Sequence, residues 1–329
     1  MVESTSGLIK KGSKDNFRLN MLGLPLIQTM GDLSSLTHVS EYTLYNLSKN
    51  ADFHYRIYDI PKKNKTPREI SQPSKRLKGL QSWILVNILN KLRVSNHCKG
   101  FEKGSSIADN AEAHIGANTI LTIDLKDFFS SIDSIRIYNI FKSIGYNSLI
   151  ATALTNICTF RGVLPQGSPC SPKLANLSAW MMDVRIQGYV GQRGISYTRY
   201  ADDISLSGLH PSKVVKLLPM IESIINDEKF VVNSDKTRIA GSARAKKVTG
   251  LVLSDNSYGI GAKKLKNIRA KIYHLVLPEE QKNIKLLNEL KGWLSYINSV
   301  DKRRLEKLHL YIKKLLNKNP ETLLAQLSI

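Results

Sequence analysis

The spacing of apolar residues in the first ninety positions predicts helices arranged around one β-hairpin. Between positions 34 and 47 apolar side chains recur at roughly helical intervals, which predicts a short helix with Ser34 or Ser35 as its N-cap. The β-rich runs FHYRIYDI (53–60) and REIS (68–71) flank the basic turn KKNKTP, so they predict a hairpin with a cationic tip. Pro73 then introduces a second helix, which we expect to end near Leu92.

Two β-rich runs in the middle of the chain carry carboxylates. TILTID ends in Asp124, and YTRYADDISLS alternates apolar and polar positions about Asp202 and Asp203. We expect both runs to be central strands of one sheet. The positions 174–186 predict a helix that follows the proline-rich loop LPQGSPCSP, and VTGLVLSDN, after position 247, predicts a further strand leading to a turn.

From position 263 onward the apolar spacing is helical in three successive segments. Positions 262–329 hold 15 Lys and Arg against 6 Asp and Glu. A basic helical face is either a solvated surface or a binding surface for a nucleic-acid backbone, and the clustering favours binding. The candidate RNA contacts at the start of this segment are Lys263, Lys264, Lys266 and Arg269.

The net charge of the whole chain indicates a polyanionic partner. Forty-eight Lys and Arg against 27 Asp and Glu give 329 residues a formal net charge of +21, which creates a field that attracts polyanions. The sequence holds no uncharged apolar stretch of about 18 residues, so we expect no membrane-spanning segment. Positions 1–20 lack the apolar core of a secretory signal, which predicts a cytoplasmic protein.

The cysteines and tryptophans are expected to be structural. Three cysteines without a C-x-x-C pair argue against a disulfide framework and against a zinc site, so we interpret them as core or loop residues: Cys98, Cys158 and Cys170. The tryptophans lie at helical spacing, which favours packing over base stacking: Trp83, Trp180 and Trp293.

The three strand-associated acids are the centre of the functional prediction. A carboxylate within or at the end of an apolar strand is costly to bury unless it coordinates a cation. A lone Asp-Asp pair is more often a turn, because Asp is a favoured turn residue. Here the pair in YADD is flanked by strands, and Asp124 ends another strand 78 positions upstream. Side by side in an antiparallel sheet, Asp124, Asp202 and Asp203 could hold two Mg²⁺ ions about 4 Å apart for phosphoryl transfer.

The motifs around these acids resemble those of a known family. IDLKDFFSSI, LPQGSPCSP, YADD and VNSDKT occur in the order and spacing of motifs A, B, C and D of reverse transcriptases, and VTGLVLSDN falls where their primer-grip strand would be. The resemblance covers positions 16–315. It is closer still to the bacterial retron reverse transcriptases, because NAEAH (110–114) and VTG (248–250) are motifs that separate retron enzymes from intron enzymes.

The resemblance implies catalytic roles for matching positions. Asp124 and Asp202 would be the principal metal ligands, with Asp203 as the third acid and the Leu125 carbonyl as an extra ligand. Lys236, in VNSDKT, would be the general acid for the pyrophosphate leaving group; a solvated surface lysine is the alternative.

It also implies a nucleotide-binding set. Phe129 would be the steric gate that excludes a 2′-hydroxyl, and the alternative for Phe129 is a core aromatic. The adjacent Phe128 is expected to be a core aromatic. Gln166 would lie beside the incoming nucleotide, or else be a loop-capping amide. The triphosphate would be bound by a bidentate arginine and two lysines of the basic turn: Arg68, Lys63 and Lys65.

The two retron motifs are expected to contact structured RNA. Asn110 and His114 are the candidate contacts in the first motif, and each could equally be a satisfied polar residue. In the second motif the candidates are Val248, Thr249 and Gly250.

The fold implied is α+β, a right-hand polymerase with fingers, an antiparallel palm sheet and a helical thumb. We expect fingers at 1–115, a palm at 116–261 with a fingers insertion at about 134–165, and a basic thumb at 262–329.

The activity implied is RNA-directed DNA synthesis from dNTPs, producing a short multicopy single-stranded DNA (msDNA). Its template would be a cognate non-coding RNA that primes from a guanosine 2′-hydroxyl, within an anti-phage system that includes an accessory effector protein.

Two other readings stay open. The chain could be a different polymerase, either a group II intron-type reverse transcriptase or an RNA replicase; the aromatic Phe129 and the absence of Gly-Asp-Asp favour DNA synthesis. It could also be a catalytically idle RNA-binding scaffold, against which the intact acids argue.

Overall fold

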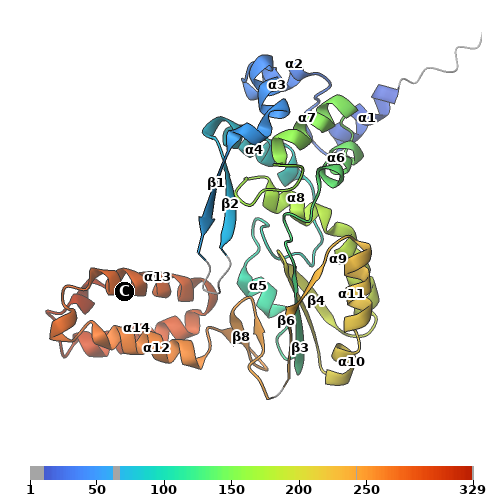
Figure 1. Ribbon diagram of the computed structural model, residues 1–329. Coiled ribbons are helices and arrows are strands. Elements are labelled where there is room, and N and C mark those ends of the chain that lie inside the picture. The colour runs from blue at the N-terminus through green and yellow to red at the C-terminus, as the bar shows by residue number, and fades with distance from the viewer. Residues whose placement is uncertain (1–10, 62–66, 242, 328–329) are drawn as a thin grey trace, which may run out of the picture.

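The computed structural model describes residues 11–61, 67–241 and 243–327. Its elements form an α+β architecture of three parts (Figure 1): helices with a projecting hairpin, a central sheet flanked by helices, and a group of C-terminal helices that stands to one side of the sheet. The right-hand arrangement that the sequence predicts is recognisable in this division.

The first part combines segments from both sides of the first palm strand in sequence. Its α-helices are α1 (Lys11–Met21), α2 (Met30–Thr37), α3 (Glu41–Lys49), α4 (Lys75–Asn87), α6 (Ser134–Ser143) and α7 (Ser148–Cys158), with 3₁₀ turns η1 (Ala51–His54) and η2 (Leu89–Lys91). Strands β1 (Tyr55–Ile60) and β2 (Arg68–Pro73) pair antiparallel, which confirms the predicted hairpin. Helix α7 packs against α3 and α4, and α6 packs against α7.

The single helix predicted over 34–47 is wrong. The chain leaves α2 at His38, whose backbone is left-handed with φ of 56°, and restarts as α3. The Ser40 hydroxyl accepts from the Thr43 N–H and so starts α3 after the break, whereas the capping box of Thr29 and Asp32 starts α2 before the predicted Ser34. Both helices contribute buried leucines to one core, Leu33 from α2 and Leu44 and Leu47 from α3.

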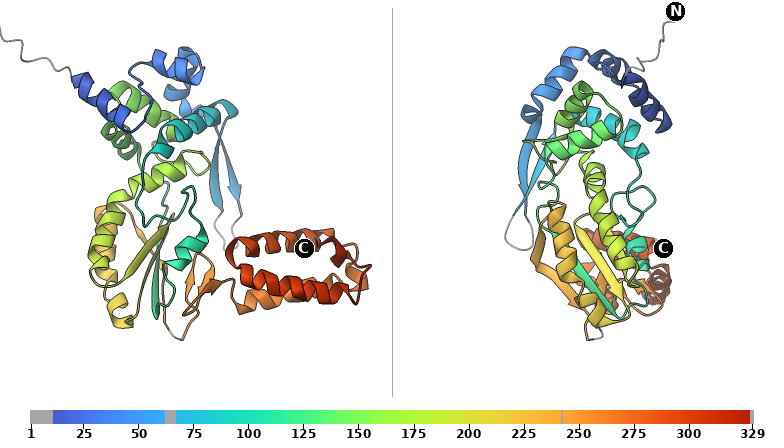
Figure 2. Two further views of the ribbon diagram at one scale, coloured as in Figure 1. Left: turned by 180° about the vertical axis from the view of Figure 1, so that it is seen from behind. Right: turned by 90° about the vertical axis from the view of Figure 1, so that its right-hand side faces the viewer.

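The palm sheet has the order β4-β5-β3-β6, with every neighbouring pair antiparallel. Its strands are β3 (Thr119–Leu125), β4 (Ser196–Tyr200), β5 (Asp203–Gly208) and β6 (Val232–Ala240). Helices α9 (Trp180–Gly191), α10 (Pro211–Val215) and α11 (Leu218–Asp227) lie on one side of the sheet, and α5 (Ile107–Glu112) lies on the other (Figures 1 and 2). The helix predicted over 174–186 is two helices, α8 (Ser171–Ser178) and α9, joined at Ala179.

The third part begins with a small sheet and continues as helices. Strands β7 (Lys247–Val248), β8 (Leu251–Leu253) and β9 (Tyr258–Gly259) pair in the order β7-β8-β9. They lead into the thumb helices α12 (Ala262–His274), α13 (Ile284–Val300) and α14 (Lys302–Leu316), with 3₁₀ turns η3 (Pro278–Glu280) and η4 (Leu323–Gln326). The predicted helical character of the C-terminal segment is confirmed.

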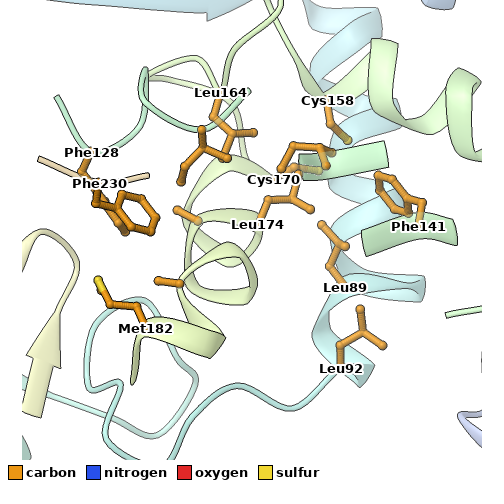
Figure 3. Close-up of a cluster of buried hydrophobic side chains, with 14 of the residues drawn as sticks. Leu89, Leu92, Phe128, Phe141, Cys158, Leu164, Cys170, Leu174, Met182 and Phe230 are labelled. Carbon is orange, nitrogen blue, oxygen red and sulfur yellow. The ribbon is translucent and has the colours of Figure 1, made fainter. Parts of the chain in front are cut away.

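Two buried apolar clusters hold these parts together. The larger cluster runs from the N-terminal helices through α8 to the palm sheet, and Figure 3 shows Cys158, Cys170 and Leu174 within it. The second cluster joins β7–β9 and the thumb helices to two residues from earlier in the chain, Ala111 and Ile120. The expected domain limits at 115/116 and 261/262 therefore each fall inside a shared core. No described helix has the length and apolar character needed to cross a membrane.

Candidate active site

Strand register gathers the predicted acids at one end of the palm sheet. Asp124 on β3 lies opposite Asp203 on β5, and on its other side it lies opposite Asn233 on β6. The Leu125 N–H donates to the Asp202 carbonyl at 3.0 Å, which fixes the YADD turn against the end of β3. The antiparallel juxtaposition that the sequence predicts is thus present.

A buried arginine, Arg199, holds the YADD turn in place through a hydrogen bond. Ala201 adopts a left-handed φ of 59°, and the Arg199 guanidinium donates to its carbonyl at 3.1 Å. Arg199 is fully buried and paired bidentately with Asp183 on α9, with both N–O distances at 2.7 Å. Burial would lower the pKa of Arg199, but the Asp183 carboxylate more than offsets it and the pKa is raised. This hydrogen-bonded pair therefore anchors the turn to α9.

Burial and neighbouring negative charge raise the pKa values of Asp202 and Asp203. Asp124 is buried, Asp202 is half-buried and Asp203 is exposed. Although Asp203 as a whole residue is exposed, partial burial of its carboxyl raises its pKa to about 6, and the carboxylates of Asp202 and Asp124 add to the rise. Loss of hydration also raises the pKa of Asp202, with a further rise from Asp124. The site therefore carries more negative charge than its surroundings stabilise, which is the condition under which a cation is bound.

Two side chains of β6 already contact Asp124. The Lys236 ammonium lies 2.9 Å from both carboxylate oxygens of Asp124, and the Asn233 amide donates to one of them at 3.1 Å. The hydrogen bond to Asp124 raises the pKa of Lys236, so this lysine is protonated. Lys236 therefore belongs to the site and is not a lysine of a remote solvated face.

The donor set fits hard divalent cations, although the acids do not converge on one point. Carboxylate and carbonyl oxygens are the ligands that Mg²⁺ prefers, and Asp124 already holds a cationic group. Across residues 11–61, 67–241 and 243–327, however, no group of three or more His, Cys, Asp or Glu side chains is arranged to hold a metal ion. Metal binding would require Asp124 to exchange its contact with Lys236.

A cavity of about 590 Å³ opens beside the acids. Six of its lining residues have sequence-predicted roles and come from five separate segments: Arg68, Asp124, Phe129, Gln166, Asp202 and Lys236. Ligand pockets commonly have volumes of about 300 to 1,000 Å³, so a nucleotide is an appropriate occupant.

The loop with Gln166 is tied to the fingers hairpin. The Ser71 N–H on β2 donates to the Gln166 carbonyl at 2.8 Å. Gly167 follows with φ of +139°, and a Cβ there would lie 2.6 Å from the Ser71 carbonyl oxygen, so only glycine allows this approach. The contact brings Arg68, which is exposed, and Gln166, which is half-buried, to the same cavity. Lys63 and Lys65 lie outside the described residues.

Phe128 and Phe129 differ as the sequence analysis anticipates. Phe128 is buried and packs on Phe230 with ring centroids 5.5 Å apart, a pair visible in Figure 3. Phe129 is half-buried and lines the cavity. Its ring also packs against the large apolar cluster, so Phe129 lies between the core and the cavity.

The expected RNA contact by Asn110 and His114 is not supported, because both side chains are buried. The His114 ring nitrogens lie 2.7 Å from the hydroxyls of Ser207 on β5 and Thr198 on β4, and burial lowers the pKa of His114 to about 4. The Asn110 amide instead donates to the Thr249 hydroxyl at 3.4 Å. The two retron motifs thus contact each other and join the palm to the thumb-side core.

The VTG motif itself forms the tight turn between β7 and β8. Val248 is buried in the thumb-side cluster, which argues against a direct RNA contact by its side chain. Thr249 has φ of 45° and Gly250 has φ of 84°, and a left-handed β-branched residue is a genuine outlier. Gly250 is exposed, so its backbone remains the accessible part of the motif.

The predicted thumb cations are all exposed on α12, but they differ in their surroundings. Lys264 lies over the Trp293 ring at 4.9 Å, and Arg269 lies over the Tyr311 ring at 4.5 Å. Such cation–π contacts hold the two side chains against α13 and α14. Lys263 and Lys266 are not among the residues for which a ring contact is found in the described chain.

The remaining structural expectations are largely met. The three cysteines are free and buried. Trp83 and Trp293 pack against the two cores, whereas the expectation for Trp180 is wrong, because its side chain is 38% exposed. Sequence reasoning missed Phe101, which lines the cavity, and the Arg199–Asp183 pair. The available signal for that pair was Arg199 itself, the one charged residue of β4 and two positions before Ala201.

Known proteins of one family match most of this chain. The family model described as "Reverse transcriptase (RNA-dependent DNA polymerase)" matches residues 60–287. The retron Ec86 reverse transcriptase of Escherichia coli is 49% identical over 311 residues, covering 93% of this chain and 96% of that protein. The retron Mx65 reverse transcriptase of Myxococcus xanthus is 29% identical, covering 89% and 73% respectively.

Among solved structures, telomerase from Candida albicans in complex with a fragment of telomeric RNA matches with a TM-score of 0.48. It is 15% identical and covers 80% of this chain and 59% of that one. The catalytic family and the retron group both rest on the sequence matches. The chain belongs to the reverse transcriptase family and, within it, to the bacterial retron reverse transcriptases, and it is an RNA-directed DNA polymerase.

Proposed function

We propose that this enzyme synthesises msDNA on a cognate retron non-coding RNA, primed from a guanosine 2′-hydroxyl of that RNA. The observation that carries the proposal is the 49% identity to a retron reverse transcriptase over nearly the whole of both chains. An anti-phage role with an accessory effector protein, and a cytoplasmic location, are the parts of the proposal that follow from the retron resemblance alone.

Reverse transcriptases generally use divalent metal ions, and we propose two Mg²⁺ ions here. Asp124, Asp202 and Asp203 would hold them, with the Leu125 carbonyl as a further oxygen donor. When bound, such ions activate the attacking hydroxyl and stabilise charge on the reacting phosphate.

The chain's own residues would do the rest by positioning. Arg68 lines the cavity, where its guanidinium would bind the triphosphate oxygens of a dNTP bidentately. Phe129 would pack beneath the sugar and leave no space for a 2′-hydroxyl. Gln166, which lines the same cavity, would contact the nucleotide as well.

Lys236 is the proposed proton donor. Its Nζ is protonated and lies 2.9 Å from Asp124, and the residue lines the cavity. On release from Asp124 it would give its proton to the departing pyrophosphate, neutralising charge as the P–O bond breaks.

The template surface would lie on the thumb side. Structured RNA is read through loops, 2′-hydroxyls and stacking, and both the cations of α12 and the Gly250 backbone are exposed there. Asn110 and His114 would act only by holding this surface in place.

The nucleic acid that copurifies with the enzyme tests the proposal. Wild-type protein should carry a branched molecule in which the 5′ end of a short DNA is joined to a 2′-oxygen within one RNA. Asp202→Asn should carry the same RNA without DNA, because folding and RNA binding do not need that carboxylate. Asp227→Asn, an exposed acid of α11 outside the cavity, should resemble the wild type.

Two results would contradict the proposal. A mixed population of unrelated RNAs would indicate a general polymerase, such as an intron-type enzyme. A cognate RNA without attached DNA in the wild type would indicate the RNA-binding scaffold.

A further inference from the structure

Phe101 is an exposed aromatic in an unusual backbone conformation at the catalytic cavity. Its φ is 62°, its side chain is 46% exposed, and it lines the cavity together with Phe129. The left-handed region is rare for residues other than glycine, asparagine and aspartate, and a bulky side chain there is strained. Packing does not account for a strained phenylalanine that remains half in solvent.

The residues on either side of Phe101 are fixed to the palm. A Cβ on Gly100 would lie 2.7 Å from the Ala201 backbone nitrogen, so only glycine lets this loop approach the YADD turn so closely. The Asn176 amide, on α8, donates to the Gly100 carbonyl at 2.8 Å. Beyond Phe101, Glu102 accepts from Lys173 at 2.6 Å and from Asn176 at 3.0 Å.

The loop is also joined to the strand that precedes the turn. The Lys99 N–H donates to the Arg199 carbonyl at 2.7 Å, and the Arg199 N–H donates to the His97 carbonyl at 2.8 Å. Strained conformations persist where the surroundings over-determine them, and they concentrate at functional sites. The ring of Phe101 is therefore presented to the cavity by a rigid support.

The ring lies near two residues of the catalytic motifs. Its centroid is 6.1 Å from that of Phe129 and 6.3 Å from that of Tyr200, the first residue of YADD. Both distances fall within the range of interacting aromatic pairs. Phe128 flanks Phe129 as well, edge-on at 5.7 Å. Phe129 thus has one aromatic neighbour in the core and another at the cavity wall.

We propose that Phe101 is a positioning residue that holds Phe129 in place and thereby sets the discrimination between dNTPs and rNTPs. This inference rests on the proposed role of Phe129 as the gate. A gate excludes a single hydroxyl only if its ring cannot move aside, and a rigid neighbour at the exposed edge restricts that motion.

A double-mutant cycle tests the proposal in primer extension with single dNTPs and rNTPs. Phe129→Ala alone should lower the ratio of kcat/KM for dNTP over rNTP. Phe101→Ala should lower the same ratio by about tenfold, a size typical of coupling between neighbouring side chains. In the Phe129→Ala background, Phe101→Ala should have less than about a twofold effect, because the ring on which it acts is gone.

Three controls separate positioning from folding. Phe101→Gly removes the ring but favours the observed φ, so the protein should stay folded while its discrimination falls as in Phe101→Ala. Phe101→Tyr should keep near wild-type discrimination. Phe53→Ala, at an 88% exposed aromatic outside the cavity, should leave the ratio unchanged.

The outcomes are distinguishable. If Phe129→Ala lowers the ratio and Phe101→Gly does not, the positioning role is wrong and the gate stands. Equal effects of Phe101→Ala in both backgrounds would also overturn it. If Phe129→Ala leaves the ratio unchanged, the gate assignment itself is wrong and the positioning role is overturned with it.

Discussion

Replacement of Asp202 should remove DNA synthesis without affecting folding. Its side chain lines the cavity and takes part in no hydrogen bond that joins other described elements, so Asp202→Asn removes charge and leaves packing intact. Metal-assisted charge stabilisation is worth several kcal/mol, so we expect DNA synthesis to fall by about a thousandfold or more. Primer extension measures this decrease, and RNA affinity should change by less than about twofold.

The Arg199–Asp183 pair should be the most costly ion pair to break. Both side chains are fully buried, and Asp183 also accepts from the Tyr197 hydroxyl at 2.6 Å. Asp183→Ala leaves a buried guanidinium without its partner, which costs about 3 to 5 kcal/mol of unfolding free energy. Urea unfolding provides the measurement.

The exposed pair of Arg185 with Asp227 is the matched control for that experiment. Asp227→Ala should cost less than about 1 kcal/mol, because exposed ion pairs contribute little. Similar decreases in the two variants would mean that Arg199 finds another partner or water once Asp183 is gone.

His114 should make stability depend on pH. Burial lowers its folded-state pKa to about 4 from an ordinary value of 6.5, so between these limits the unfolded chain binds more protons than the folded one. Stability is therefore fully present above pH 6.5 and decreases as pH falls toward 4. Between about pH 7.5 and about pH 5 the unfolding free energy of the wild type should fall by about 2 kcal/mol more than that of His114→Gln in urea unfolding. Identical decreases in both proteins would show that His114 is not the neutral buried group described here.

Sequence reasoning succeeded at residues whose chemistry depends on strand ends and failed where burial depends on distant elements. Asp124, Asp202 and Asp203 could be placed together because period-two alternation fixes the ends of their strands. His114 could not be recognised as buried, because the hydroxyls that satisfy it come from Thr198 and Ser207, 84 and 93 positions away.

At the scale of elements, helices and strands were predictable but breaks between helices were not. Apolar spacing reports which side of a helix faces the core, and it continues unchanged when two short helices share that core, as α2 and α3 do. The left-handed His38 and the cap at Ser40 decide the break, and Ser34 or Ser35 were equally plausible caps by residue type. The loop with Phe101 has no periodicity, so its position at the cavity had no signal in the pattern.

The cations of α12 should divide into two classes. Lys263→Gln with Lys266→Gln should weaken RNA binding, and it should reduce the slope of log K against log salt by about 0.7 to 0.9 for each phosphate that is no longer neutralised. Lys264→Gln with Arg269→Gln should in addition lower thermal stability, because these side chains cover Trp293 and Tyr311. Salt titrations of RNA binding and thermal unfolding measure the two effects. An unchanged slope in the first pair would place those lysines on a solvated surface.

At the scale of the whole molecule, the boundary predicted between palm and thumb, at 261/262, falls within one shared apolar core. The thumb-side core includes Val248, Leu251 and Ile260 before α12 begins, and it extends to Ala111 on α5 and Ile120 on β3. A hydrogen bond between the two retron motifs crosses the same boundary. Composition could not reveal this, because a core shared between segments leaves no charge signature in either one.

That boundary determines how template choice should be tested. A self-priming enzyme must hold one internal hydroxyl of one RNA at the acids, whereas phosphate contacts carry no sequence information, so recognition must lie in surfaces outside the palm. A chimera in which only residues 262–329 are replaced by those of a related retron enzyme would divide the thumb-side core between two proteins. A chimera in which the chain from Lys247 onward is replaced transfers β7–β9 and the thumb helices together. The larger chimera should prime on the RNA of the donor enzyme and keep extending an annealed primer on a generic template, while the smaller one should be less stable. Retained preference for the original RNA, in a chimera that still extends annealed primers, would show that the thumb side does not choose the template.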